Sequence, residues 1–275
     1  MKFRPDRILW LFCLIIAILI VLFPIYMMLK YSISDKSSIV TGGEVIPLWP
    51  YAPTLQQFVY IFRDHEFLQA IWASVRVSML TILFAMGLGV PAAYVLARFQ
   101  IPGKVVLLVS LISIRLFPDI SSVVPVTVVF INLNLVNTVM GAALAHTLLS
   151  LPYVIYISMG VFESIPQDLE MQAQILGASK MYSFIRIIFP LAVPGLAAAA
   201  IYTFLLSWDE FIFSYFLLGF GEIKTLPVFL KSKMAFSPPQ NYLAAISVML
   251  SLPVILFTFF LQKYMKTDVM AGSVK

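Results

Sequence analysis

The sequence predicts an all-α protein that crosses a membrane with about six helices. Of its 275 residues, 61% are hydrophobic and 11% are charged, whereas about a quarter of the residues in a soluble domain are charged. Its mean hydropathy is +0.97. Several long stretches also lack Asp, Glu, Lys and Arg, and a membrane helix needs about 20 mostly apolar residues. These observations exclude a soluble globular enzyme and a disordered protein.

The predicted spans belong to a single transmembrane domain, 1–275, and cover residues 8–29, 73–97, 105–130, 138–162, 187–213 and 242–262. The chain is uncharged from 120 to 162, which is too long for one helix, and the polar stretch 132–137 divides it. The part before this stretch is expected to continue backward through 105–114 as one helix that carries Arg115 and Asp119.

The distribution of Lys and Arg predicts a multi-pass protein of the cell membrane with both termini in the cytoplasm, because cytoplasmic loops are enriched in these residues. In that orientation the cytoplasmic segments hold the larger set: Lys2, Arg4, Arg7, Arg98, Lys104, Lys180, Arg186, Lys263, Lys266 and Lys275. The outer segments hold Lys30, Lys36, Arg63, Lys224, Lys231 and Lys233. We therefore attribute the net charge of +5 to topology rather than to nucleic-acid binding.

Prolines and small residues recur within the spans. Prolines kink helices, and a broken helix is tolerated in a membrane where its freed carbonyls face protein or a wet cavity. The prolines in question are Pro24, Pro91, Pro118, Pro125, Pro152, Pro194 and Pro253. They favour a protein that moves or encloses a path, although membrane helices are in general richer in proline. The spacing of Ala93 with Ala97, and of Gly195 with Ala199, predicts close helix contacts.

The loop 163–186 predicts a short helix outside the bilayer. Pro166 suits a first turn, and Asp168 and Glu170 follow it near the positive end of the helix dipole. Gly177 is expected to cap the C-terminus, and a second short helix is expected at about 180–188. The loop is either an ordinary linker or the element through which a soluble partner moves the membrane domain.

Several motifs lie along the chain in a recognisable order. The loop holds Ala173 and Gly177 and ends in Ile188-Phe189-Pro190-Leu191; Ser207-Trp208-Asp209-Glu210-Phe211 and Thr225-Leu226-Pro227 follow, and the tail reads Asp268-Val269-Met270-Ala271-Gly272-Ser273-Val274-Lys275. In these features the sequence resembles the permease subunits of binding-protein-dependent ABC importers, in particular the G-type subunit of maltose and trehalose importers. The cytoplasmic signature of that family is Glu-Ala-Ala, three residues and Gly, known as the EAA motif. Here Met171 and Gln172 stand at its first two positions, and Glu170 lies one place early.

The resemblance implies a type I ABC importer permease that works by alternating access with several partners. They are a second homologous permease, two ATPase subunits and an extracytoplasmic sugar-binding protein. The chain lacks the Gly-x-x-x-x-Gly-Lys-Ser/Thr phosphate loop, so ATP and Mg are expected on the partner ATPase, and this chain is expected to hold no cofactor. The expected ATPase contacts in the loop are Glu170, with the role of the signature acid, Met171, Gln172, Ala173, Gly177 and Ala178. A further contact is expected at the tail: Ala271, Gly272, Ser273, Val274 and Lys275.

Ionisable residues within membrane spans are costly and usually face the protein interior or water. Trp208 with Asp209 or Glu210 is a candidate sugar-binding wall, although the pair of acids could also lie hydrated at the outer interface. Neighbouring residues point about 100° apart on a helix, so at most one of these acids is expected to face the path.

Two further positions within the spans carry ionisable groups. Arg115 and Asp119 are four residues apart, which favours an ion pair over a substrate contact. His146 is expected to form hydrogen bonds between helices, and no metal site is expected from one cysteine and two histidines.

The sequence thus indicates a transport subunit of an ATP-driven importer of a disaccharide or oligosaccharide, and not an enzyme. The nearest alternative is a permease for glycerol phosphate or polyols. An ion-coupled secondary transporter would be supported by inverted repeats, which the sequence does not display. A lipid-modifying enzyme within the membrane would need clustered His, Asp or Glu, and Asp209 with Glu210 is too little.

Overall fold

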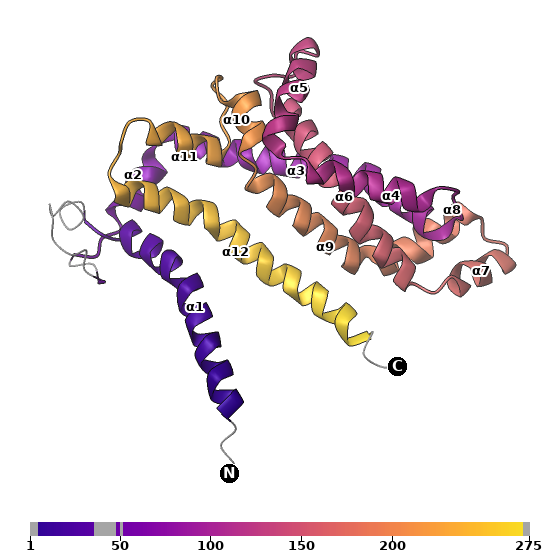
Figure 1. Cartoon of the computed structure of the whole chain (residues 1–275). Coiled ribbons are helices and arrows are strands. Elements are labelled where there is room, and N and C mark those ends of the chain that lie inside the picture. Colours follow the sequence, from indigo (N-terminus) through magenta and orange to yellow (C-terminus); the bar gives the residue numbers. More distant parts are fainter. Residues whose placement is uncertain (1–4, 36–47, 50–51, 272–275) are drawn as a thin grey trace. The chain divides into compact units, whose positions relative to one another are not determined.

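The computed structural model describes residues 5–35, 48–49 and 52–271 (Figure 1). Within these ranges the regular elements are helices, apart from one isolated bridge between Ser34 and Pro53. Five helices among them are long and apolar enough to span a membrane: Trp10–Ser32, His65–Arg98, Val139–Ser164, Lys180–Trp208 and Gln240–Phe260. A sharply bent pair of helices raises the number to as many as six. The predicted all-α membrane architecture is therefore confirmed.

The chain forms two compact units, and the first consists of Met1–Leu68 and Leu230–Leu252. It holds α1 (Pro5–Ser32), α2 (Gln56–Arg63), the end of α11 (Leu226–Met234) and the first part of α12 (Gln240–Ala271). The Asn241 side chain donates a hydrogen bond to the carbonyl of Ser34 at 3.1 Å. Lys233 lies 3.3 Å from Asp64 and 3.1 Å from Glu66. Burial opposes the charge of Lys233, but the hydrogen bond to Glu66 and the nearby Asp64 carboxylate raise its pKa.

The second unit consists of Gln69–Phe229 and Pro253–Lys275. Its centre is the pair α6 (Val139–Ser164) and α9 (Phe189–Trp208), which lie side by side (Figure 1). A Cβ on Gly195 of α9 would lie 2.6 Å from a methyl group of Val161 on α6. The predicted close contact at Gly195 and Ala199 is confirmed, because Ala199 is also fully buried.

Two apolar clusters hold the ends of this second unit. The first cluster joins the end of α3 (His65–Arg98), the second half of α6 and the beginning of α9 through Val90, Ala93, Leu96, Ile155, Met159, Phe162, Ile188, Ala192 and Leu196. The second cluster joins α3, α5 (Asp119–Asn132), α6 and α10 (Ile212–Leu218) through Val77, Val123, Phe130, Ala142, Ala143, Ala145, Phe213, Leu217 and Leu218. The polar residues of interest lie between and beside these clusters.

The third predicted span is broken, which corrects the expectation of one helix over 105–130. It consists of α4 (Lys104–Ser113), a 3₁₀ turn (Ile114–Leu116) and α5, and the two parts are bent by 99°. Phe117 has extended backbone angles, φ −74° and ψ 135°. The cause is Pro118, because a proline disfavours the helical conformation of the residue before it.

The fifth predicted span, 187–213, also differs. Its helix begins earlier, because α8 (Lys180–Ser183) and a π-helical turn (Phe184–Ile188) continue directly into α9. The second short helix expected at about 180–188 is therefore part of this span. At its other end α9 stops at Trp208, and α10 starts after a break at residues 209–211.

Candidate functional site

A cavity of about 470 Å³ opens beside the break between α9 and α10. Its polar lining comes from the bend before α5, from α5, α6, α9 and the break itself: Arg115, Asp119, His146, Tyr202, Ser207, Asp209 and Glu210. Apolar side chains complete it: Leu149, Leu205, Leu206, Phe211, Ile212 and Val254. Four of the sequence-predicted path residues, Arg115, Asp119, Asp209 and Glu210, thus meet in one cavity.

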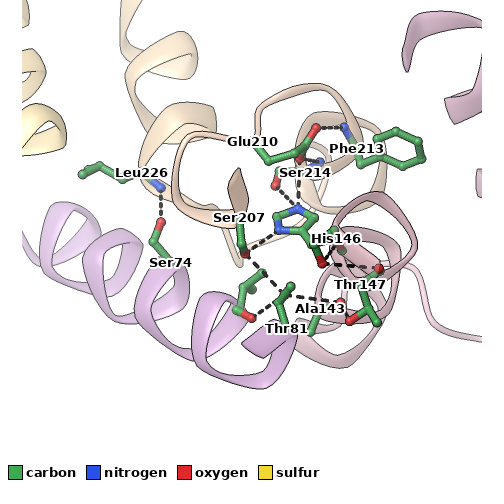
Figure 2. A network of polar contacts seen from close by, with 12 residues as sticks. Ser74, Thr81, Ala143, His146, Thr147, Ser207, Glu210, Phe213, Ser214 and Leu226 are labelled. Atoms are coloured by element: carbon green, nitrogen blue, oxygen red, sulfur yellow. Dashed lines mark hydrogen bonds and ion pairs between the residues drawn. The ribbon is translucent and has the colours of Figure 1, made fainter. Parts of the chain in front are cut away.

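His146 is the centre of a buried polar network at the wall of this cavity (Figure 2). Its Nδ1 lies 2.8 Å from the Ser207 hydroxyl, and its Nε2 lies 2.9 Å from the Glu210 carboxylate. Nε2 also lies 3.0 Å from the Ser214 hydroxyl. Ser207 in turn bonds to Thr81 of α3 at 3.3 Å. The expectation that His146 forms hydrogen bonds between helices is confirmed, because it links α6, α9 and α10.

Glu210 has a structural role in this network. Its carboxylate accepts hydrogen bonds from the backbone N–H groups of Phe213 at 2.7 Å and Ser214 at 2.9 Å, which is the way a capping side chain satisfies the first turn of a helix. With His146 on the same carboxylate, Glu210 fixes the start of α10 (Figure 2).

Asp209 and Glu210 both line the cavity, which corrects the expectation that at most one acid would face it. The 100° separation applies only within a helix, and these two residues lie in the break after α9. Asp209 is exposed, whereas the Glu210 side chain is only 10% exposed. Asp209 is therefore the carboxylate of the pair that a ligand in the cavity can reach.

Arg115 and Asp119 form the predicted ion pair, with 2.9 Å between Nη1 and Oδ1. The pair closes across the bend at Pro118, so it does not require a continuous helix. The guanidinium also lies 5.7 Å from the centre of the Tyr153 ring. Its Nε is buried without a hydrogen-bond partner among the described residues.

Trp208 does not line the cavity, unlike the acids that follow it. It is buried and stacks on Phe204, with 5.4 Å between ring centres. Tyr202, which we did not single out in the sequence, takes part in the lining. The available signal was its spacing, since Tyr202 precedes Asp209 by about two helical turns.

The loop helix α7 (Asp168–Ile175) lies at the other end of the second unit, beside α8 (Figure 1). Gly177 has φ +91°, its N–H bonds to the carbonyl of Gln174, and the N–H of Ala178 bonds to the carbonyl of Ala173, each at 3.0 Å. This pattern is the Schellman motif, in which a glycine takes the left-handed position. The predicted C-cap at Gly177 is confirmed.

The predicted contact residues of the loop divide into exposed and inward-facing groups. Met171 and Gln172 are exposed, as are Ile175 and Leu176 at the end of the helix, which are 83% and 87% exposed. We call Met171, Ile175 and Leu176 the α7 tip. Gly177 is also exposed, whereas Ala173 is buried and Ala178 is half-buried.

Glu170 faces its own chain rather than the surrounding space. Its Oε1 lies 2.6 Å from Nε of Arg98, and its Oε2 accepts a hydrogen bond from the Tyr94 hydroxyl at 2.8 Å. Both partners belong to α3 and were missed in the sequence, where nothing local connects them with the loop. The predicted tail contact at Gly272–Lys275 lies outside the described residues, and Ala271 is the last residue of α12.

Comparison with known proteins identifies the family. The family model for the inner membrane component of binding-protein-dependent transport systems matches residues 6–270. A trehalose transport system permease protein of Mycobacterium tuberculosis is 32% identical over 249 residues, which are 89% of this chain and 90% of that protein. A sulfoquinovosyl glycerol transport system permease protein of Agrobacterium fabrum is 30% identical over 255 residues, 92% of this chain and 89% of that one.

A solved structure of a bacterial ABC transporter involved in the import of the acidic polysaccharide alginate shows the same fold. One of its chains matches with a TM-score of 0.80 and 24% identity, and the match covers 96% of this chain and 99% of that chain. Because the family model matches nearly the whole chain, and a relative above 30% identity covers nine tenths of it, the assignment is direct. The chain belongs to the inner membrane components of binding-protein-dependent transport systems, the ABC importer permeases, and is a transport subunit rather than an enzyme.

Proposed function

We propose that this chain is one of two permease subunits of an ATP-driven importer for a disaccharide or oligosaccharide. The names of its relatives support a glycoside substrate: they include transport permeases for trehalose, for trehalose and maltose in Thermococcus litoralis, and for diacetylchitobiose in Streptomyces coelicolor. A permease for osmoprotective compounds in Synechocystis keeps a polyol or glycerol phosphate as the second candidate. The family assignment argues against an ion-coupled transporter and a lipid-modifying enzyme.

The polar cavity beside the α9–α10 break is the observation that carries this proposal. Charged groups in a membrane domain usually mark a substrate or ion path, and Arg115, Asp119 and Asp209 come together here from distant parts of the chain. Carboxylate, guanidinium and phenol groups can exchange hydrogen bonds with the hydroxyl groups of a sugar. We assign this cavity as the contribution of this subunit to the translocation path.

The energy source would act through α7. Its tip exposes apolar side chains at Met171, Ile175 and Leu176, and we propose that it docks on one of two ATPase subunits, which hold ATP and Mg. The residues 271–275 would supply a second contact with the ATPase. In this arrangement α7 and both chain termini lie in the cytoplasm, and an extracytoplasmic binding protein delivers the sugar from the opposite side.

Transport would then proceed by alternating access. Closure of the ATPase pair would push on α7, and α6 and α9, which flank α7 in the chain and pack tightly on each other, would follow. Such a change is a shift between two states, driven by a partner that binds one of them more tightly.

The test is purification of the tagged chain from its own host in mild detergent, followed by mass spectrometry. We expect an ATPase and a second permease to copurify, and the reconstituted complex with its binding protein to take up radiolabelled trehalose or maltose only with ATP. Uptake of glycerol 3-phosphate or a polyol in place of both sugars would favour the second candidate. A chain that purifies alone and transports without ATP would contradict the proposal.

A further inference from the structure

We propose that Arg98, Glu170 and Tyr94 form a latch that locks α7 to the end of α3, so that these two helices move as one rigid body throughout the transport cycle. Glu170 is then a positioning residue, and the contact with the ATPase falls on the α7 tip. The inference rests on the proposed function in one respect, namely that α7 is the element on which an ATPase acts.

Each oxygen of the Glu170 carboxylate has its own partner on α3. Arg98 donates from Nε to Oε1 at 2.6 Å, and Tyr94 donates from its hydroxyl to Oε2 at 2.8 Å. Arg98 is one helical turn beyond Tyr94, so both side chains reach the loop from the same face of α3. Arg98 also donates from Nη2 to the carbonyl of Ile165 at 2.9 Å, at the C-terminus of α6. The latch therefore connects α3, α6 and α7.

The latch is shielded from solvent. The Arg98 side chain is 6% exposed and the Glu170 side chain is 12% exposed. The Tyr94 ring packs against two aromatic rings, with its centre 5.5 Å from that of Phe162 on α6 and 4.3 Å from that of Phe184 in the π-helical turn before α9. Its hydroxyl is thereby aimed at the carboxylate by side chains from both helices that flank the loop.

Burial makes the latch unsuited to opening. Two charges withdrawn from water are stable only while they remain paired and hydrogen-bonded, because separating them leaves an uncompensated charge in an apolar environment. If α7 slid away from α3 during transport, both Arg98 and Glu170 would lose their partners at once. A force on the α7 tip is therefore passed to α3 as well as to α6 and α9.

The same region supplies a matched control. Lys104 and Glu163 also form an ion pair, at 3.2 Å, but their side chains are 28% and 46% exposed. Such exposed pairs contribute little, because water and salt screen them. Glu163→Gln thus removes the same charge a few residues from Glu170 without disturbing a buried network.

The first experiment compares Glu170→Gln with Glu163→Gln in the complete complex. We expect Glu170→Gln to keep the ATPase during purification but to hydrolyse several-fold more ATP per molecule of trehalose or maltose taken up. Glu163→Gln should match the wild type in both measurements. Loss of the ATPase from Glu170→Gln would overturn the latch, because it would mean that Glu170 contacts the ATPase directly.

The second experiment replaces the latch with a covalent link. The single cysteine, Cys13, is changed to Ser, and Arg98→Cys and Glu170→Cys are combined and joined with a short bifunctional maleimide. We expect poor coupling before the reaction and recovered coupling after it, since α3 and α7 need not separate. Transport that is blocked by the link, while ATPase binding persists, would contradict the rigid body.

A failure of the proposed function would look different. If the wild-type complex takes up neither sugar with ATP, the proposed function fails, and the latch is then judged from copurification alone. In that case, retention of the ATPase by Glu170→Gln supports the latch and its loss contradicts it.

Discussion

At the scale of single residues, the two acids after α9 have different environments although they are neighbours in the chain. Glu210 bonds to His146 and to two backbone N–H groups of α10. Asp209 is exposed at the cavity. Adjacent residues of the same type therefore serve different purposes, and mutation of each should separate stability from transport.

Glu210→Ala is expected to destabilise the protein. It leaves His146 and the first turn of α10 without their acceptor in a buried place, and breaking one side of a buried pair costs about 3–5 kcal/mol. The melting temperature of the purified protein in detergent should fall clearly, and a variant that melts with the wild type would contradict the role of Glu210 as a cap.

Asp209→Asn is expected to leave the melting temperature unchanged and to weaken uptake. A hydrogen bond to a charged group contributes about 1.5–3 kcal/mol, so the trehalose or maltose concentration for half-maximal uptake should rise roughly ten-fold if Asp209 binds the sugar. The measurement is ATP-dependent uptake by the reconstituted complex. Unchanged uptake of whichever sugar the wild type transports would remove Asp209 from the path.

At the scale of helices, the packing of α6 on α9 depends on one missing side chain. A Cβ on Gly195 would meet Val161 at 2.6 Å, whereas a Cβ on Gly160 of α6 would meet nothing within 4 Å. Val161 is β-branched and has little rotamer freedom in a helix, so it cannot easily move aside. The two glycines form a matched pair of sites for testing the helix contact.

Gly195→Ala is expected to destabilise the pair of helices by about 1–3 kcal/mol through overpacking. Gly160→Ala should be neutral or slightly stabilising, because alanine is favoured over glycine in a helix. Thermal melting in detergent distinguishes the two variants. Equal melting temperatures for both would show that α6 and α9 separate easily, which would also weaken the case for their joint movement.

At the scale of the whole molecule, the helices fix which segments share a side of the membrane. If the bent pair α4–α5 crosses once, the described part of the chain crosses six times. The turn after α3 and the loop with α7 then lie on one side, and the segment between α11 and α12 lies on the other. A pair of helices that turned back within the membrane would reverse this arrangement for everything after it.

Labelling of single cysteines tests the topology. After Cys13→Ser, we expect Gln100→Cys and Leu176→Cys to react with a membrane-impermeant maleimide only in inside-out vesicles, and Phe236→Cys only in right-side-out vesicles. All three positions are exposed. If Gln100→Cys and Leu176→Cys react from opposite sides, α4 and α5 do not form one crossing.

The sequence by itself determined the features that depend on composition and on neighbours along the chain. The membrane class and the approximate spans follow from long uncharged stretches, because the bilayer admits few charges. The Arg115–Asp119 pair, the cap at Gly177 and the close approach at Gly195 follow from spacings of a few residues. Even the break at Pro118 had a local cause, although the sequence pattern was interpreted as one helix.

Only the tertiary structure decided which distant side chains meet. Glu170 bonds to Tyr94 and Arg98, which are 76 and 72 residues away in the chain, and no periodicity connects the two segments. The meeting of Asp209 with Arg115 and Tyr202 in one cavity, and the burial of Trp208 outside it, likewise depend on how the helices pack. The choice of partner for a charge is set by which helix ends share one buried environment, and that information belongs to the folded chain as a whole.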